Sequence, residues 1–249
     1  MPGKTDTNQT PADTSRFATT HWTLVLAAGS PDSSRYREAL ETLCRTYWFP
    51  LYAYLRRKGY NINEAEDYTQ GFFARLLEKE SLQYADPARG KFRYFLLASL
   101  KNFIANEWDR IKARKRGGDR NILQLDTQTA ENRYESGLPV ELSPEKLFER
   151  SWALTVLQQA FAGLQMQYGK AGKGILFDHL KEYLSGEQTA VSYREVATTL
   201  GMSEDAIKVA MHRLRRQYRE LVRREIAQTV TTPGQIEEEI RDLFTALSS

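Results

Sequence analysis

The stretch that decides the fold is residues 192–208, which read SYREVATTLGMSEDAIK. Ser192 followed three residues later by Glu195 has the pattern of a capping box, which marks the start of a helix. Gly201 can adopt the left-handed conformation that a tight turn requires, and Ser203 can cap a second helix. The pattern therefore predicts a helix-turn-helix with helices at about 192–200 and 203–224.

The second of these helices has an apolar side and a polar side. Ile207, Met211 and Leu214 recur at helical spacing and should pack against the first helix. A capped helix N-terminus with outward Lys and Arg suits entry into the major groove of DNA, and the remaining arginines suit phosphate contacts. An αα-hairpin with a basic, solvated face is the alternative. The side chains expected to point outward are Lys208, Val209, His212, Arg213 and Arg216.

The charge of the chain is balanced overall but uneven along its length. The 249 residues include 35 basic and 32 acidic ones, for a net charge of +3. Residues 101–116 contain six basic and two acidic residues, and residues 205–224 contain seven and two. Two basic stretches of this kind suggest two contacts on one polyanion. Two solvated helix faces would give the same composition, so this alternative stays open.

The rest of the chain also has the apolar spacing of helices and lacks extended alternating patterns. Pro50 lies inside the first helical run, where we expect a kink or a break. Gly117 to Ser143 is polar, with glycines and prolines, and is predicted to be a linker. Helices are expected from about Arg35 to Gly59, at 63–80, 91–115, 144–168 and 175–184, and after Pro233.

These segments predict an all-α fold with two helical bundles joined by a flexible linker, the second containing the helix-turn-helix. The acidic helix at the end could shield the basic recognition helix or pack on the second bundle. The expected layout is an N-terminal tail and strap at 1–32, a first bundle at 33–116, the linker at 117–143, the helix-turn-helix domain at 144–228 and a C-terminal acidic extension at 229–249.

Composition excludes several classes of protein. No window approaches the roughly 18 uninterrupted apolar residues that a spanning helix needs, and residues 1–8 lack the apolar core of a secretory signal. Cys44 is the single cysteine, and His21, His179 and His212 lie far apart. We therefore expect a cytoplasmic protein with no disulfide, no metal site and no cofactor.

Three segments, in order, resemble those of bacterial RNA polymerase sigma factors of the extracytoplasmic-function (ECF) type. Residues 64–76, EAEDYTQGFFARL, are similar to the clamp-binding helix of that family. The segment from Phe92 through Lys101 and Asn102 to Arg110 resembles its −10-recognition helix. The helix-turn-helix resembles its −35-reading module. The resemblance covers roughly residues 33–116 and 145–226.

The resemblance implies an adaptor that binds core RNA polymerase and promoter DNA and has no catalytic residues of its own, so that the chain is not an enzyme. An anti-sigma factor is a further partner that the family suggests. The positions implied at the polymerase clamp are Asp67, Gln70, Phe73 and Arg75. Those implied at the −10 strand are Lys101, Asn102, Asn106 and Arg110, and those at the −35 element are Lys208, Val209, His212 and Arg213.

Aromatic side chains could stack on unpaired bases, but at helical spacing Tyr94, Phe103 and Trp108 are expected in the core. Two other functions remain open. One is a helix-turn-helix regulator whose N-terminal bundle senses a ligand or dimerises. The other is a metal-dependent nuclease that uses Glu64, Glu66 and Asp67, although consecutive acids at a helix start are also favourable with the helix dipole.

Overall fold

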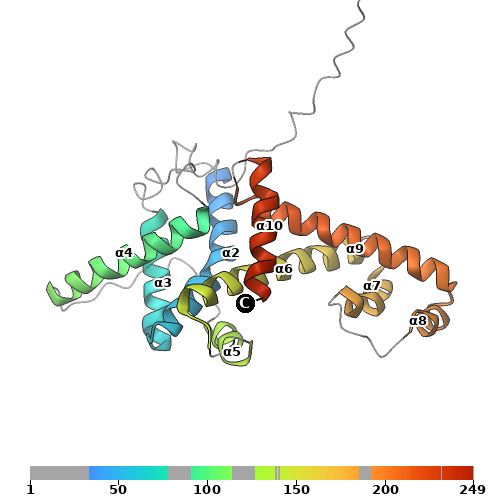
Figure 1. Cartoon of the computed structure of the whole chain (residues 1–249), viewed down its shortest axis with the longest axis horizontal. Helices are drawn as coiled ribbons and strands as arrows, with labels where there is room; N and C mark the ends of the chain where they lie inside the picture. The colour runs from blue at the N-terminus through green and yellow to red at the C-terminus, as the bar shows by residue number, and fades with distance from the viewer. Residues whose placement is uncertain are drawn as a thin grey trace, which may run out of the picture.

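The computed structural model describes residues 34–77, 91–113, 127–137, 139, 141–184, 192–230 and 232–248. Every regular element in these ranges is a helix (Figure 1), which confirms the predicted all-α class. None of the helices described has the length and apolar character that crossing a bilayer requires. The expected tail and strap at 1–32 lie outside the described residues.

The helices follow the predicted order, with one addition in the expected linker. Their bounds are α2 Ser34–Arg57, α3 Ile62–Leu77, α4 Phe92–Ala113, α5 Thr127–Gly137, α6 Pro144–Lys170, α7 Gly174–Leu180, α8 Tyr193–Leu200, α9 Glu204–Ala227 and α10 Pro233–Ser248, with a 3-10 turn at Lys181–Leu184 after α7.

A local capping motif determines where α3 begins, whereas packing keeps α2 helical through a proline. Asn61 Oδ1 accepts a hydrogen bond from the Glu64 backbone N–H at 3.0 Å, and Glu64 Oε2 accepts one from the Asn61 N–H at 2.9 Å. Asn61 therefore caps α3. Of the kink or break expected at Pro50, a break is wrong, because α2 continues through this residue. Phe49 and Leu51 are buried on either side, and this packing offsets the backbone hydrogen bond that proline removes.

A first hydrophobic core forms between α2, α3 and α4 and takes in parts of four other helices. Its fully buried members from α2 include Leu51 and Leu55, and α4 contributes Leu96 and Leu100. The later elements contribute Ala130 from α5, Leu147, Phe148, Trp152, Ala153 and Val156 from α6, Ile226 at the end of α9, and Ile236, Leu243 and Ala246 from α10.

A second core lies among the rest of α6 and α7, α8 and α9. Ala160, Leu164 and Tyr168 continue α6 into it, so one 27-residue helix belongs to both cores. Burial of side chains as large as Leu147, Phe148 and Trp152 contributes about 1.5–3 kcal/mol each, which opposes separation of α6 from α2. The predicted pair of flexibly joined bundles is therefore not confirmed.

Helix α5 lies within the segment predicted to be a flexible linker. Ala130 and Glu131 are buried, and Glu131 accepts hydrogen bonds from Tyr52 and Arg56 of α2. Arg57 Nη2 donates to the Pro139 carbonyl at 2.9 Å, which holds the chain after α5 on α2 as well. From residue 127 onward, the part of the linker that the structure describes is thus docked on the first core. This corrects the prediction for those residues.

Candidate nucleic-acid interface

Helices α8 and α9 are joined by a short turn whose ends are capped as the sequence predicts. Ser192 Oγ accepts from the Glu195 N–H at 3.3 Å, and Glu195 Oε2 accepts from the Ser192 N–H at 2.9 Å. Gly201 has φ of 63° and ends α8 in the left-handed conformation. Ser203 Oγ accepts from the Ala206 N–H at 3.2 Å and starts α9. The predicted caps and turn are confirmed.

The apolar side of α9 is buried and its polar side is exposed, as expected. Val196 and Ala197 of α8 and Ile207, Met211 and Leu214 of α9 are buried in the second core. All five residues predicted to contact DNA are exposed, and the apolar Val209 is 50% exposed. The five are Lys208, Val209, His212, Arg213 and Arg216. The structure thus brings these side chains together at the surface of a single helix.

Two of these cations are held by acids on the same helix. Lys208 Nζ lies 2.9 Å from Glu204 Oε1, and this hydrogen bond raises the pKa of Lys208. Arg216 Nε lies 3.0 Å from Glu220 Oε1. Pairs this exposed are worth little energetically, so a phosphate can compete for either cation.

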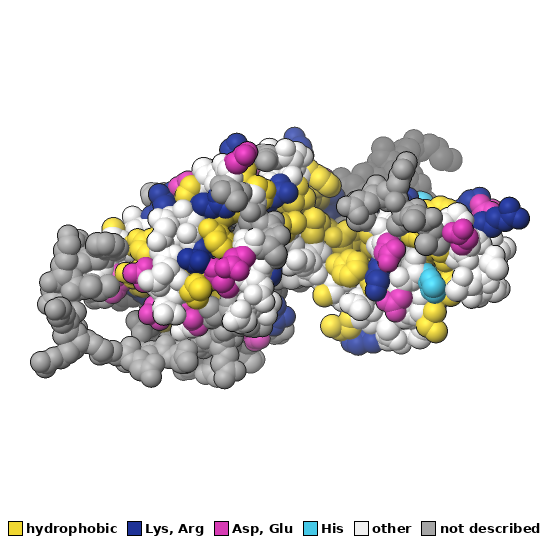
Figure 2. Space-filling model, turned by 90° about the horizontal axis from the view of Figure 1, so that it is seen from below, with side chains coloured by type: hydrophobic (Ala, Val, Ile, Leu, Met, Phe, Trp, Pro, Cys, Tyr) yellow, Lys and Arg dark blue, Asp and Glu magenta, His cyan; other side chains and the backbone are white. Residues whose placement is uncertain are grey.

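The basic surface of α9 also includes arginines of the kind that the sequence predicts for phosphate contacts. Arg215 and Arg219 are also exposed, and Arg215 Nη2 donates to the Tyr183 carbonyl at 3.2 Å. Their spacing from His212 by three and seven residues places them beside it on the surface of the helix. On the face of the molecule seen in Figure 2, Lys and Arg side chains are interspersed with acidic ones, and apolar side chains gather near the middle.

The second candidate surface lies on α4. Lys101, Asn102 and Asn106 are exposed there, whereas the side chain of Arg110 falls outside the described residues. Lys101 Nζ lies 2.8 Å from Glu145 Oε1 of α6. This hydrogen bond raises the pKa of Lys101 and lowers the pKa of Glu145. The start of α6 therefore sets a carboxylate beside the predicted −10 surface.

The aromatic side chains that were predicted in the core of this region differ in their exposure. Phe103 is buried, as expected, and packs edge-on against Phe72. Tyr94 is 45% exposed, so its assignment to the core is wrong. The side chain of Trp108 lies outside the described residues.

The predicted polymerase-binding residues on α3 divide between surface and core. Asp67 and Arg75 are exposed, and Gln70 is half-buried and donates to Glu66 Oε1 at 3.1 Å. Phe73 is fully buried in the first core. Its place in a surface contact is therefore wrong, because α3 is covered by both α2 and α4.

Helices α3 and α4 approach closely at Gly71. A Cβ atom at this position would meet Phe103 Cζ at 3.2 Å. Such a contact is tighter than ordinary van der Waals packing, so glycine suits this crossing.

The acids at the start of α3 have local partners. Glu64 completes the cap of α3, and Glu66 accepts from Gln70. Among the described residues, no group of three or more His, Cys, Asp or Glu side chains is placed to hold a metal ion.

Helix α10 contacts α9 at the end opposite the predicted DNA-reading residues. Glu237 Oε1 lies 2.5 Å from Arg223 Nη1, whereas Lys208 and Arg213 remain exposed near the other end. The structure therefore does not support shielding of the recognition helix at its predicted DNA-reading residues, although α10 pairs with Arg223 near the end of that helix. Packing on the second bundle is only part of its role, because α10 also pairs with Arg93 of α4 and contributes Ile236, Leu243 and Ala246 to the first core.

Comparisons with known proteins found no family model, no curated protein and no solved structure that matches this chain.

Proposed function

We propose that this protein is an ECF-type sigma factor that binds core RNA polymerase and directs it to promoters. The observation that carries the proposal is the capped α8–turn–α9 pair with Lys208, Val209, His212 and Arg213 exposed along α9. A helix of this form can place its first turns in the major groove. The exposed Lys101, Asn102 and Asn106 of α4 supply a second contact suited to an unpaired strand, since asparagine both donates to and accepts from base edges.

The test is association with purified bacterial core RNA polymerase, followed by run-off transcription from promoters selected out of a random DNA pool. We expect a stable complex and transcripts that begin at defined sites only when the chain is present. Failure to bind core polymerase would refute the proposal.

The second candidate is a helix-turn-helix regulator that binds a palindromic site by itself. The shared position of α6 in both cores favours it, because a regulator needs a sensing or dimerising bundle fixed to its reading helix. Tight binding to duplex DNA without core polymerase, and without transcription, would select this function.

A further inference from the structure

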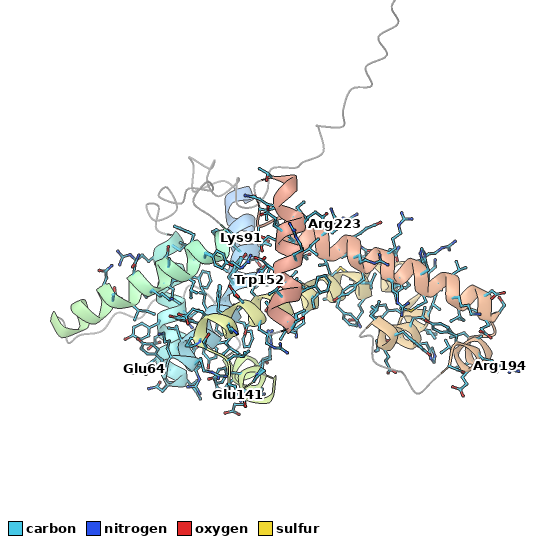
Figure 3. The ribbon with its side chains drawn as sticks, viewed as in Figure 1. Glu64, Lys91, Glu141, Trp152, Arg194 and Arg223 are labelled. Atoms are coloured by element: carbon cyan, nitrogen blue, oxygen red, sulfur yellow. The ribbon has the colours of Figure 1, made fainter. Side chains whose placement is uncertain are left out.

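Helix α10 contacts both α4 and α9, through Arg93 of α4 and Arg223 of α9. These two helices extend in opposite directions from the middle of the molecule, where α10 lies (Figure 1). Figure 3 shows Lys91, Trp152 and Arg223, which come from beside α4, from α6 and from α9, gathered around α10. One helix therefore contacts the elements that carry both candidate DNA surfaces.

The contacts of α10 on the α4 side are ionic and largely buried. Arg93 is 2% exposed and pairs with Glu239 and Asp242 of α10. Its guanidinium also lies over the rings of Tyr94 and Trp152, at 4.6 and 4.4 Å from their centroids. A cation buried in this way depends on its carboxylate partners, because an unpaired buried charge is strongly unfavourable.

The remaining contacts of α10 connect it to the other elements. Lys91 Nζ lies 2.5 Å from Asp242 Oδ2, and Glu237 pairs with Arg223 of α9. Arg150 of α6 donates to the Leu247 carbonyl at 2.7 Å. Ile236, Leu243 and Ala246 are buried in the first core. Because α10 pairs with Arg93 of α4 and with Arg223 of α9, these contacts together restrict the motion of α9 relative to α4.

We propose that α10 is a clasp that holds α4 and α9 in one fixed relative placement. Arg93 and Glu239 are then positioning residues for the spacing between the two DNA elements that the chain recognises. Each base pair lengthens a duplex by about 3.4 Å, so a rigid pair of readers accepts a narrow range of spacers. The part of the proposal that concerns DNA rests on the proposed function, whereas the part that concerns rigidity does not.

The first test measures a distance between spin labels at Ala98→Cys on α4 and Gln217→Cys on α9, both exposed positions outside the predicted sites. Cys44 is buried and the pKa of its thiol is raised to about 12, so it does not compete for the label. We expect one narrow distance in the free chain and the same distance in the complex with core polymerase. A broad distribution in the free chain, or a shift on binding, would overturn the proposal.

The second test compares Glu239→Gln with Glu238→Gln, which removes an exposed charge from the same helix. The Glu239 variant should broaden the distance distribution, and the Glu238 variant should not. Circular dichroism confirms that both remain helical. If Glu239→Gln unfolds the chain, Asp242→Asn, which removes a more exposed partner of Arg93, replaces it. An unchanged distribution in a folded clasp variant would refute the clasp.

The third test uses the selected promoter with its spacer lengthened or shortened one base pair at a time. Transcription by the wild-type chain should fall steeply away from one spacer length, and Glu239→Gln should flatten this profile. An equal loss at every spacer length would show a merely structural role and overturn the positioning assignment. If the wild-type chain binds no core polymerase, the proposed function fails, while the distance in the free chain still decides the clasp.

Discussion

Glu131 on α5 accepts hydrogen bonds from Nη2 and Nε of Arg56 on α2, at 2.6 and 3.0 Å, and both side chains are largely removed from solvent. The Tyr52 hydroxyl donates to the same carboxylate. Arg56 further donates to the Tyr60 carbonyl at 2.7 Å, next to the turn before α3. The Glu131 carboxylate, which lies in the segment expected to be a linker, thus joins α5 to α2.

Replacement of Glu131 by Gln should lower the free energy of unfolding by about 1–3 kcal/mol, because the Arg56 guanidinium loses its charged partner. Chemical denaturation at neutral pH measures this change. Glu135→Gln, at an exposed position on the same helix, is the matched control and should change stability by less than about 0.5 kcal/mol. Equal effects of the two variants would show that the ion pair contributes no specific stability.

Acid should weaken the same contact. The hydrogen bond from Arg56 lowers the pKa of Glu131 below its ordinary value of 4.5. Below that ordinary value the unfolded chain takes up a proton that the folded chain does not, so stability falls as the pH falls toward the folded-state pKa. The wild-type chain should therefore lose more stability than Glu131→Gln between about pH 5 and pH 3. Parallel curves for the two proteins would contradict this expectation.

The position of α5 shows what the sequence can and cannot predict. The helices around the cores follow from apolar spacing and from caps such as Ser192 with Glu195, which act within a few residues. Helix α5 is polar and offers little periodicity. Its docking depends on Arg56 and Glu131, which lie 75 residues apart in the chain. Pairing at this separation leaves no local pattern, so the segment resembled a linker.

The residues of the candidate site could be predicted where helical spacing decides their exposure, but not where the packing of several helices does. The exposed face of α9 follows from helical spacing once Ser203 fixes where the helix begins. The prediction that Phe73 lies at the polymerase clamp was wrong because α3 is packed by α2 on one side and by α4 on another, so that Phe72 and Phe73 both face neighbouring helices. Both phenylalanines are consequently buried. The burial of both side chains depends on how α2, α3 and α4 pack together, which helical spacing alone does not reveal.

Asp67→Arg should weaken association with core polymerase without a loss of stability, because Asp67 is exposed on α3. Phe73→Ala provides the contrast, since truncation of a fully buried phenylalanine costs about 3–5 kcal/mol of stability. Binding to immobilised core polymerase and thermal unfolding distinguish the two effects. An unaltered affinity of the Asp67 variant would remove this residue from the interface.

Arg213→Ala should reduce promoter binding by about 1–3 kcal/mol if the guanidinium reads a base, and the loss should then depend on the base at one position. A phosphate contact instead gives a loss that is uniform across sequences and lowers the salt dependence of binding. Titrations of the polymerase complex at several salt concentrations separate the two cases. Lys173→Ala, an exposed cation between α6 and α7, serves as the control. Binding equal to the wild type in both respects would place Arg213 outside the interface.

Gly201→Ala should destabilise the chain by about 1 kcal/mol, because φ of 63° is unfavourable for a residue with a side chain. The cost is conformational rather than steric, since a Cβ atom there would meet nothing within 4 Å. Gly169→Ala is the matched control: its Cβ also meets nothing within 4 Å, but the residue lies inside α6 and lacks a positive φ. Alanine at 169 should therefore be neutral or stabilising by up to about 1 kcal/mol. Denaturant unfolding of both variants tests the difference, and equal stabilities would show that the turn between α8 and α9 does not require the left-handed conformation.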